Sequence, residues 1–227
     1  MNRRPLIVFD VNETLLDLEA LTPIFELVLS DRLAMRLWFA DLILYSEALT
    51  LAGAYVPFTD IGAAVLQMLA ASRGVTVNDG EKRALTDAFA TMPPHKEVPS
   101  ALLRLREAGF RLFTLTDNLL EIQTRQLEHG GILQHFERRF SVDSIGRHKP
   151  AAEAYQHVQD ALGAAPADFL LIASHTWDTI GALAAGWRAA LIKRPGNYPL
   201  SVGPQPDLIG DDLTQVANQL IERYGRS

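Results

Sequence analysis

Cysteine is absent from the 227 residues of this chain. Three classes of site are therefore excluded at once: disulfide frameworks, zinc sites built from thiolates, and cysteine nucleophiles. Any covalent catalysis has to use another side chain, such as a carboxylate or a hydroxyl.

The chain also lacks a block of basic residues and a long uninterrupted apolar run. Its formal net charge of −6 argues against double-stranded nucleic acid as a main partner. The most apolar long window, residues 33–58, contains Arg36, Asp41 and Glu47, so it does not predict a membrane span. The apolar segment near the N-terminus is too short for a signal-peptide core. These observations predict a soluble, cytoplasmic protein.

The composition itself is that of a globular protein. Hydrophobic residues make up 48% of the chain and charged residues 21%, which is enough apolar material for a real core. At roughly 150 residues per domain, this length predicts one large domain or two unequal ones.

Four short apolar segments predict buried parallel strands, because they lack the alternation of a sheet with one wet face. They span residues 6–9, 111–116, 169–173 and 189–193. Helical patterns accompany them, for example at residues 100–108 and 151–162. The alternation predicts an α/β fold with a doubly wound, Rossmann-like parallel sheet, and functional groups at the carboxyl ends of its strands.

A helical insert follows the first strand. Residues 21–29, 32–50, 60–73 and 78–90 all have helical patterns, and no strand pattern separates them. A segment with three prolines, residues 91–99, would be the return hinge. We therefore expect residues 16–95 to form a helical cap domain, and residues 1–15 and 96–227 to form the α/β catalytic core.

Polar side chains follow the predicted strands in an ordered series. Asp10 and Thr14 follow the first strand, Thr116 ends the second, Lys149 precedes a proline, and Asp178 lies just beyond the third. Taken singly, Asp10, Thr14 and Thr116 are more simply interpreted as helix caps, and Lys149 as a surface lysine. Together they supply a nucleophile, two hydroxyls, a cation and a second carboxylate.

This ordered series resembles the haloacid dehalogenase superfamily, whose motifs are Phe-Asp-x-x-x-Thr-Leu, a Ser or Thr after a strand, Lys-Pro, and a terminal Asp. The resemblance covers essentially the whole chain, because the helical insert lies where that superfamily has its cap. Within it, the L-2-haloacid dehalogenases are the most similar group. Further matches to that group are Leu16-Asp17, Ser141-Val142-Asp143, Tyr155, residues 174–178, residues 194–197 and residues 206–208.

The superfamily also contains magnesium-dependent phosphatases, and two positions argue against that reaction. Phosphatases carry a general-acid aspartate two residues after the nucleophile, where this chain has Asn12, which cannot exchange a proton near neutral pH. Ser174 replaces the first aspartate of their acidic magnesium-binding segment, leaving Asp178 alone. Halide needs no proton to leave, so Asn12 is compatible with dehalogenation.

The resemblance implies a covalent mechanism without a metal or other cofactor, in which Asp10 displaces halide from C2 of a small-molecule 2-haloacid and water hydrolyses the resulting ester. Lys149 would keep Asp10 ionised, and Thr14 and Asp178 would orient Asp10, the lysine and the water. Thr116 and its neighbouring backbone would hold the substrate carboxylate. The remaining substrate-site residues expected from the family are Val11, Asn12, Phe39, Phe58, Asp117, Tyr155, His175 and Trp177. For Phe39, Phe58 and Trp177, burial in a core is the alternative to a halogen pocket.

Three positions depart from the L-2-haloacid dehalogenases. The family's cap arginine aligns with Phe39, and Arg36 and Arg32 on the same predicted helix are the candidates to replace it. His175 stands where the family has an asparagine that positions water, and would act as a base, as a cation, or only as a hydrogen-bond partner. Asp117 adds a negative charge beside the expected carboxylate site.

The sequence therefore predicts a haloacid dehalogenase-like hydrolase that converts a short (S)-2-haloacid into the (R)-2-hydroxy acid through an ester on Asp10. The rival interpretations are a magnesium-dependent phosphatase of a small metabolite and a non-catalytic family member. The apolar cap face between Leu37 and Leu51 predicts either a homodimer contact or packing against the core.

Overall fold

The computed structural model describes residues 4–225, in which one parallel sheet of six strands has the order β3-β2-β1-β4-β5-β6. This is the strand order of a Rossmann-like fold, with a topological switch point between β1 and β4. The strands are β1 Leu6–Phe9, β2 Arg111–Thr116, β3 Arg138–Ser141, β4 Phe169–Ala173, β5 Arg188–Ile192 and β6 Leu208–Gly210. The predicted α/β class is confirmed.

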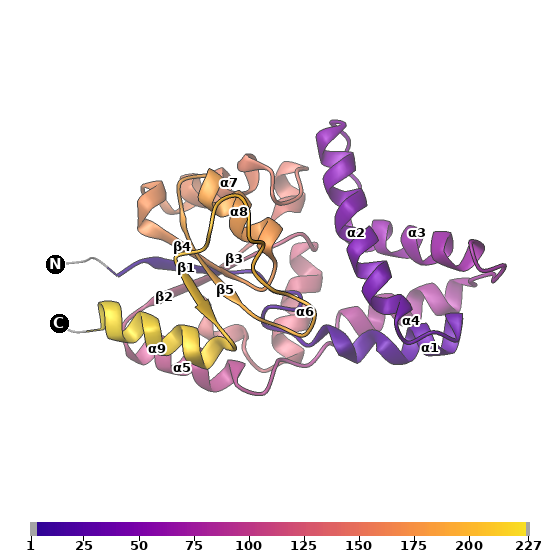
Figure 1. The fold of residues 1–227 in the computed structure, drawn as a ribbon, viewed down its shortest axis with the longest axis horizontal. Coiled ribbons are helices and arrows are strands. Elements are labelled where there is room, and N and C mark those ends of the chain that lie inside the picture. Colours follow the sequence, from indigo (N-terminus) through magenta and orange to yellow (C-terminus); the bar gives the residue numbers. More distant parts are fainter. Residues whose placement is uncertain (1–3, 226–227) are drawn as a thin grey trace.

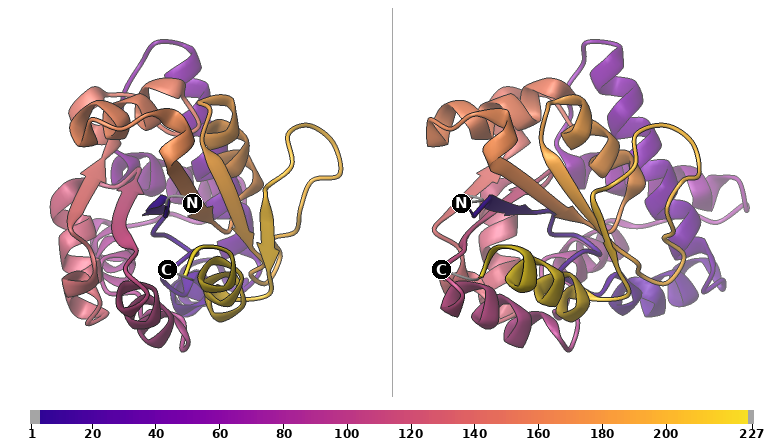
Figure 2. Two further views of the ribbon diagram at one scale, coloured as in Figure 1. Left: turned by 90° about the vertical axis from the view of Figure 1, so that its left-hand side faces the viewer. Right: turned by 60° about the vertical axis from the view of Figure 1, so that its left-hand side comes forward.

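Helices cover both faces of the sheet (Figures 1 and 2). Ile7 and Phe9 of β1 belong to one apolar cluster with α5 and α9, whereas Val8 belongs to a second cluster with α7 and α8. This alternation follows from the two-residue period of a strand, and burial on both sides explains the continuous apolar runs. The core helices are α5 Val98–Glu107, α6 Leu120–His129, α7 Ala152–Leu162, α8 Thr176–Ala184 and α9 Leu213–Tyr224.

The helices expected after the first strand form a group of their own beyond the carboxyl ends of the strands (Figure 1). They are α1 Thr22–Leu29, α2 Ala34–Leu51, α3 Phe58–Ala71 and α4 Asp79–Phe89. Trp38 anchors their packing: its ring lies 5.2 Å from that of Phe25 and 6.1 Å from that of Phe89, and its indole N–H donates to the Gly62 carbonyl. Glycine leaves room for this contact, because a Cβ at Gly62 would lie 3.1 Å from the indole.

The two chain crossings between this helical group and the sheet lie side by side. Leu16 bridges both Asn12 and Pro94, and the Asp17 N–H donates to the Pro93 carbonyl. These contacts support the proposed division of the chain near residues 16 and 95. The ends of the proposed core domain, residues 1–3 and 226–227, lie outside the described residues.

Two strands of the structure, β3 and β6, were not predicted from the sequence. β3 was not predicted because Arg138 and Arg139 make its sequence look like a solvated loop, and β6 has only three residues. Both are edge strands, where polar residues are tolerated and local signals are weak. The fourth predicted strand, residues 189–193, begins and ends one residue earlier, at Arg188 and Ile192. No helix within residues 4–225 is long and apolar enough to cross a membrane.

Candidate active site

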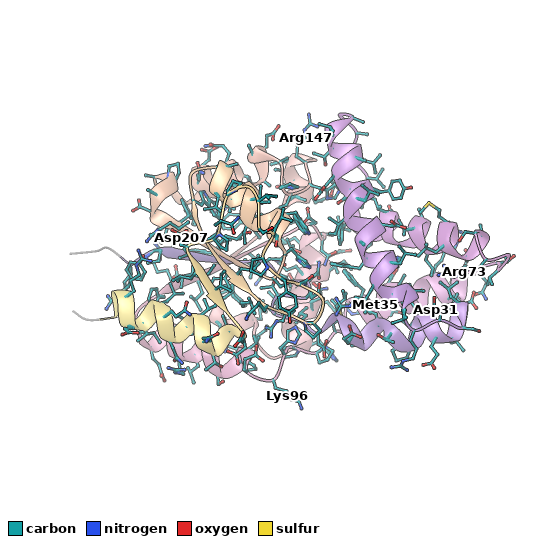
Figure 3. All side chains as sticks on the ribbon, viewed as in Figure 1. Asp31, Met35, Arg73, Lys96, Arg147 and Asp207 are labelled. Carbon is teal, nitrogen blue, oxygen red and sulfur yellow. The ribbon has the colours of Figure 1, made fainter. Side chains whose placement is uncertain are left out.

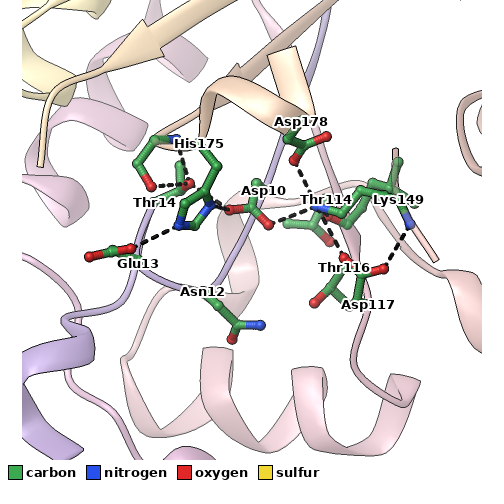
Figure 4. A network of polar contacts seen from close by, with 12 residues as sticks. Asp10, Asn12, Glu13, Thr14, Thr114, Thr116, Asp117, Lys149, His175 and Asp178 are labelled. Atoms are coloured by element: carbon green, nitrogen blue, oxygen red, sulfur yellow. Dashed lines mark hydrogen bonds and ion pairs between the residues drawn. The ribbon is translucent and has the colours of Figure 1, made fainter. Parts of the chain in front are cut away.

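The polar residues predicted at the strand ends converge at the switch point of the sheet (Figure 4). Phe9 pairs with Thr114 of β2 on one side and with Ile172 of β4 on the other, so Asp10 leaves the sheet between these two strands. Its backbone N–H continues the ladder by donating to the Ile172 carbonyl. The Asp10 residue is only 4% exposed.

Lys149 joins the two predicted catalytic carboxylates. Its Nζ donates to Asp10 Oδ1 at 2.8 Å and to Asp178 Oδ2 at 2.7 Å, and the lysine side chain is fully buried. Burial by itself raises the pKa of Asp10, but the charges of Lys149 and His175 outweigh it and hold that pKa well below its usual range. Burial lowers the pKa of Lys149, but the surrounding carboxylates outweigh it and raise that pKa. Asp10 is therefore an ionised carboxylate at neutral pH.

Thr14, which is itself held by Ser174, orients the second oxygen of Asp10. The Thr14 hydroxyl donates to Asp10 Oδ2 at 2.6 Å, and accepts the backbone N–H of Ser174 at 2.9 Å. The Ser174 hydroxyl lies 3.1 Å from that of Thr14. Both oxygens of Asp10 are thus oriented by neighbours, and Thr14 is not a helix cap.

Tyr155 acts on the lysine only through Asp178. Its hydroxyl donates to Asp178 Oδ1 at 2.7 Å, while Lys149 occupies Oδ2 of the same carboxylate. Asp178 is wholly buried at the start of α8. Both of its oxygens therefore accept a hydrogen bond from a fixed donor.

A second row of charged side chains runs from Asp10 through His175 to Glu13 and Arg36, and of these four residues the sequence analysis did not name Glu13. His175 Nδ1 lies 3.5 Å from Asp10 Oδ2, and its Nε2 lies 2.8 Å from Glu13 Oε2. The other oxygen of Glu13 pairs with Arg36 of α2. Glu13 escaped notice because a carboxylate in a loop after a strand normally faces solvent, whereas here it is 2% exposed with a φ of 61°.

The pKa values in this second row move in opposite directions. Burial lowers the pKa of His175, but the carboxylates of Asp10 and Glu13 outweigh it and raise that pKa to about 9. Burial raises the pKa of Glu13, but His175 and Arg36 outweigh it and lower that pKa to about 2. At neutral pH, these four side chains alternate in charge: a carboxylate, an imidazolium, a second carboxylate and a guanidinium.

Asp117 does not present a free charge to the site. Its Oδ1 lies 3.2 Å from His148 Nδ1 and accepts the backbone N–H of Lys149 at 2.9 Å. Its Oδ2 lies 3.7 Å from Lys149 Nζ. The negative charge expected to repel a substrate carboxylate is directed toward a histidine and a lysine, which reduces the conflict noted in the sequence.

The remaining predicted positions near Asp10 form hydrogen bonds within the protein. Asn12 Oδ1 accepts hydrogen bonds from Asn118 at 3.2 Å and from Gln126 at 3.1 Å. Thr116 Oγ1 accepts the Asn118 N–H at 3.3 Å, which leaves its own hydroxyl hydrogen available. Val11 is buried, and its carbonyl accepts from the turn that follows.

The three aromatic candidates surround the charged groups from different sides. The Trp177 ring stacks on His175 at 5.2 Å and lies 5.4 Å from Lys149 Nζ. The Phe39 ring lies 5.5 Å from His175, and the Phe58 ring lies 6.0 Å from His148. Phe39 and Phe58 are both buried in the apolar core, and of the two only Phe39 also lines the cleft beside His175.

A cleft of about 820 Å³ between the cap and the core reaches this site. Phe39, His175 and Trp177 form part of its lining, together with Arg32 and Arg36. Neither arginine replaces the missing family arginine with a free charge, because Arg36 pairs with Glu13 and Glu19, and Arg32 pairs with Glu26. Farther along α2, Arg147 of the core donates to the Thr50 carbonyl (Figure 3).

These groups do not fit a magnesium ion. The position between Asp10 and Asp178, the two carboxylates from which magnesium could be held, contains the ammonium of Lys149. The Asn12 carbonyl oxygen is committed to two amide donors. No group of three or more histidine, aspartate or glutamate side chains in the described part of the chain is arranged to hold a metal.

A family model for haloacid dehalogenase-like hydrolases matches residues 5–186. The chain is 30% identical over 171 residues to haloacetate dehalogenase H-2 of Moraxella sp. (strain B), covering 75% of this chain and 76% of the relative. It is 28% identical over 171 residues to an (S)-2-haloacid dehalogenase of Pseudomonas sp. (strain YL), covering 75% and 74%. A solved L-2-haloacid dehalogenase is similar with a TM-score of 0.90 and 25% identity, over 95% of this chain and 98% of that one.

Proposed function

Because this chain belongs to the haloacid dehalogenase-like hydrolases, we propose that it removes halide hydrolytically from short 2-haloacids. The observation that carries the proposal is the bridge from Asp10 through Lys149 to Asp178. In this bridge the nucleophile Asp10 is ionised, and its counter-ion is the ammonium of Lys149 rather than a metal. The relatives named for haloacetate and (S)-2-haloacids support the substrate class. In-line attack by Asp10 would invert an (S)-acid to the (R)-hydroxy acid.

In the first step, an oxygen of Asp10 attacks C2 of the substrate in line with the carbon–halogen bond. The C2–O bond forms as the carbon–halogen bond breaks, and the halide leaves with the bonding electron pair, so no general acid is needed. Thr14 and Lys149 fix the orientation of the attacking carboxylate, which lowers the entropic part of the barrier.

The substrate carboxylate lies against Thr116, whose hydroxyl hydrogen is free to donate to it. Phe39, Phe58 and Trp177 form the apolar surroundings of the halogen. A phenyl edge contacts a halide only weakly. We therefore expect Phe39 to support halide departure less well than the cationic arginine of the family.

In the second step, water attacks the carboxyl carbon of the Asp10 ester and releases the 2-hydroxy acid. Lys149 lies against Asp10 Oδ1, where negative charge develops as water adds. Asp178, fixed by Tyr155, keeps the ammonium of Lys149 in that position.

The experiment that tests the function is halide release from racemic 2-chloro-, 2-bromo- and 2-fluoro-acids in excess EDTA. Metal-independent release of halide together with the hydroxy acid is expected. Phosphate release from small phosphate esters with magnesium, and no halide release, would instead establish the phosphatase alternative. The absence of both activities would indicate a non-catalytic family member.

Replacement of the nucleophile gives the first specific prediction. Asp10→Asn keeps the shape of the side chain but replaces the carboxylate with a far poorer nucleophile, so kcat should fall by roughly 10⁴-fold or more. The measurement is steady-state halide release, with thermal unfolding to verify that the variant is folded. Full turnover by Asp10→Asn would contradict a covalent mechanism through this residue.

The homodimer expected from the sequence stays part of the proposal. Leu37, Leu44 and Leu51 recur every seven residues on α2 and are 47%, 55% and 91% exposed. An exposed apolar stripe of this kind supports a contact between two copies. Light scattering of wild type and Leu44→Glu tests it, since the charge should give a monomer. The cytoplasmic location likewise stays a prediction.

A further inference from the structure

His175 is the one histidine beside the proposed nucleophile, and both of its ring nitrogens have distinct surroundings. Nε2 is held by Glu13 at 2.8 Å, whereas Nδ1 is buried, lies 3.5 Å from Asp10 Oδ2, and makes no hydrogen bond within the described residues. A carboxylate on one nitrogen and a free second nitrogen facing the reacting group is the arrangement of a general base. Figure 4 shows the ring between the two carboxylates.

We propose that His175 is the general base that activates water for hydrolysis of the Asp10 ester, and that Glu13 is its positioning residue. This inference rests on the proposed dehalogenase function and assigns its second step. Water for the step has a route to the ring, because both His175 and Glu13 lie on the cleft between the cap and the core.

The geometry favours His175 over Asp178 for this role. Both oxygens of Asp178 already accept hydrogen bonds, from Lys149 and Tyr155, and its side chain has no exposed surface. The geometry also separates His175 from the halide. In-line displacement sends the leaving group to the side of C2 opposite Asp10, whereas His175 lies beside the attacking carboxylate.

The backbone conformation of Glu13 is energetically unfavourable, which indicates that the contacts of its side chain hold it in place. It adopts a left-handed φ of 61°, which is unfavourable for a residue with a side chain. The buried carboxylate has partners on both sides, His175 from the core and Arg36 from α2 of the cap. An element of the cap therefore fixes the group that orients the base.

The charge change at Asp10 explains when His175 becomes basic. The charged groups around the ring are Asp10 and Glu13, with Arg36 beyond Glu13, and Lys149 and Asp178 beyond Asp10. Alkylation turns Asp10 into a neutral ester and removes one of the two carboxylates that raise the pKa of His175. The ring then loses its proton to solvent, and Nδ1 becomes a proton acceptor only after the first step.

The protons of the second step balance. Neutral His175 takes a proton from water as the water oxygen bonds to the Asp10 carboxyl carbon. The tetrahedral intermediate collapses with cleavage of the bond between that carbon and the substrate oxygen, which takes the proton back from His175. The carboxylic acid left on Asp10 then protonates His175 and restores the resting ion pair. One proton has gone to solvent in the whole cycle.

The test is a rapid-quench experiment with 2-bromoacetate on wild type and His175→Gln, whose amide keeps a donor toward Glu13 but offers no base. Bromide should appear in a burst of one equivalent at close to the wild-type rate. Release of the hydroxy acid should slow by about 10²–10⁴-fold, and intact-protein mass spectrometry should find the ester accumulated on Asp10. His129→Gln, at an exposed histidine on α6, is the matched control and should behave as wild type.

Glu13→Gln is the second variant, for use also if His175→Gln does not fold. It keeps a partner for Nε2 but removes the negative charge, so the acid limb of the kcat profile should move to lower pH while the bromide burst is retained. A slowed burst without ester accumulation in both variants would overturn the assignment of His175 to the second step. Absence of bromide release by wild type would instead reject the proposed function.

Discussion

At the scale of single residues, the site is defined by how each charge is compensated. Lys149 is fully buried between Asp10 and Asp178, and His175, which is 6% exposed, lies between Asp10 and Glu13. Such groups are stable in a dry interior only when they are paired and hydrogen-bonded. A change of protonation that breaks one of these pairs leaves a buried charge without a partner, so the stability of the fold should depend on pH.

The Glu13–His175 pair gives a prediction for that dependence. The pKa of His175 is raised to about 9, so its contribution is fully present below pH 6.5 and is lost as the pH rises through 9. The pKa of Glu13 is lowered to about 2, so its contribution is present above pH 4.5 and is lost as the pH falls toward 2. Both contributions are complete only between about pH 4.5 and 6.5.

The measurement is the free energy of unfolding by urea at pH 6 and pH 10, for wild type and His175→Gln. Since one pKa unit corresponds to about 1.4 kcal/mol, wild type should lose roughly 3 kcal/mol more than the variant over this range. Equal losses in the two proteins would show that the imidazolium is not stabilised by its two carboxylates.

At the scale of elements, the close approach of α7 and α8 positions the carboxylate behind the lysine. Gly181 makes this approach feasible, because a Cβ at that position would lie 2.6 Å from Pro150 Cβ and would also meet the Tyr155 hydroxyl. Tyr155 comes from α7 and Asp178 from α8, so the hydrogen bond between them depends on how closely the two helices pack.

Gly181→Ala should therefore affect stability and activity together. Insertion of a methyl group into this contact should cost about 1–3 kcal/mol and move Tyr155 away from Asp178. We expect kcat to fall with little change in KM, measured beside the urea midpoint. Gly80→Ala, at the start of α4 and remote from the site, is the control. A variant destabilised to this extent with unchanged kcat would argue against a role of Tyr155.

At the scale of the whole molecule, the site is closed between two parts of the chain. The side chains of Asp10, Lys149 and Asp178 are 5%, 0% and 0% exposed, so we expect the cap to move when a substrate carbon approaches Asp10 in line. The two parts are joined by the paired crossings near Leu16 and Pro94, and touch again where Tyr55 donates to Asp143.

An engineered disulfide tests this movement, in a chain that has no cysteine of its own. A Cβ built on Gly146 of the core lies 3.7 Å from Cβ of Tyr55, within the range of a disulfide. Oxidised Tyr55→Cys/Gly146→Cys should turn over at least about tenfold more slowly than the same protein after reduction. The reduced form is its own control, and equal rates in the two forms would show that catalysis does not require the cap to open here.

The sequence by itself determined the α/β class, the helical insert and the strand-end series of Asp10, Thr14, Thr116, Lys149 and Asp178. These depend on local properties: continuous apolar runs, helical periodicity, and polar residues placed directly after strands. Edge strands β3 and β6 were missed because three or four residues at an edge have too little burial to impose a pattern.

Only the tertiary structure decided what the charges do to one another. It turned Asp117 toward His148, committed Arg36 to Glu13, and placed Glu13 behind His175. The partners in these contacts are up to 162 residues apart along the chain. Electrostatic energy depends on distance and burial, which no local pattern specifies. The sequence therefore left the role of His175 open among base, cation and hydrogen-bond partner, and the contacts made in the fold favour the base.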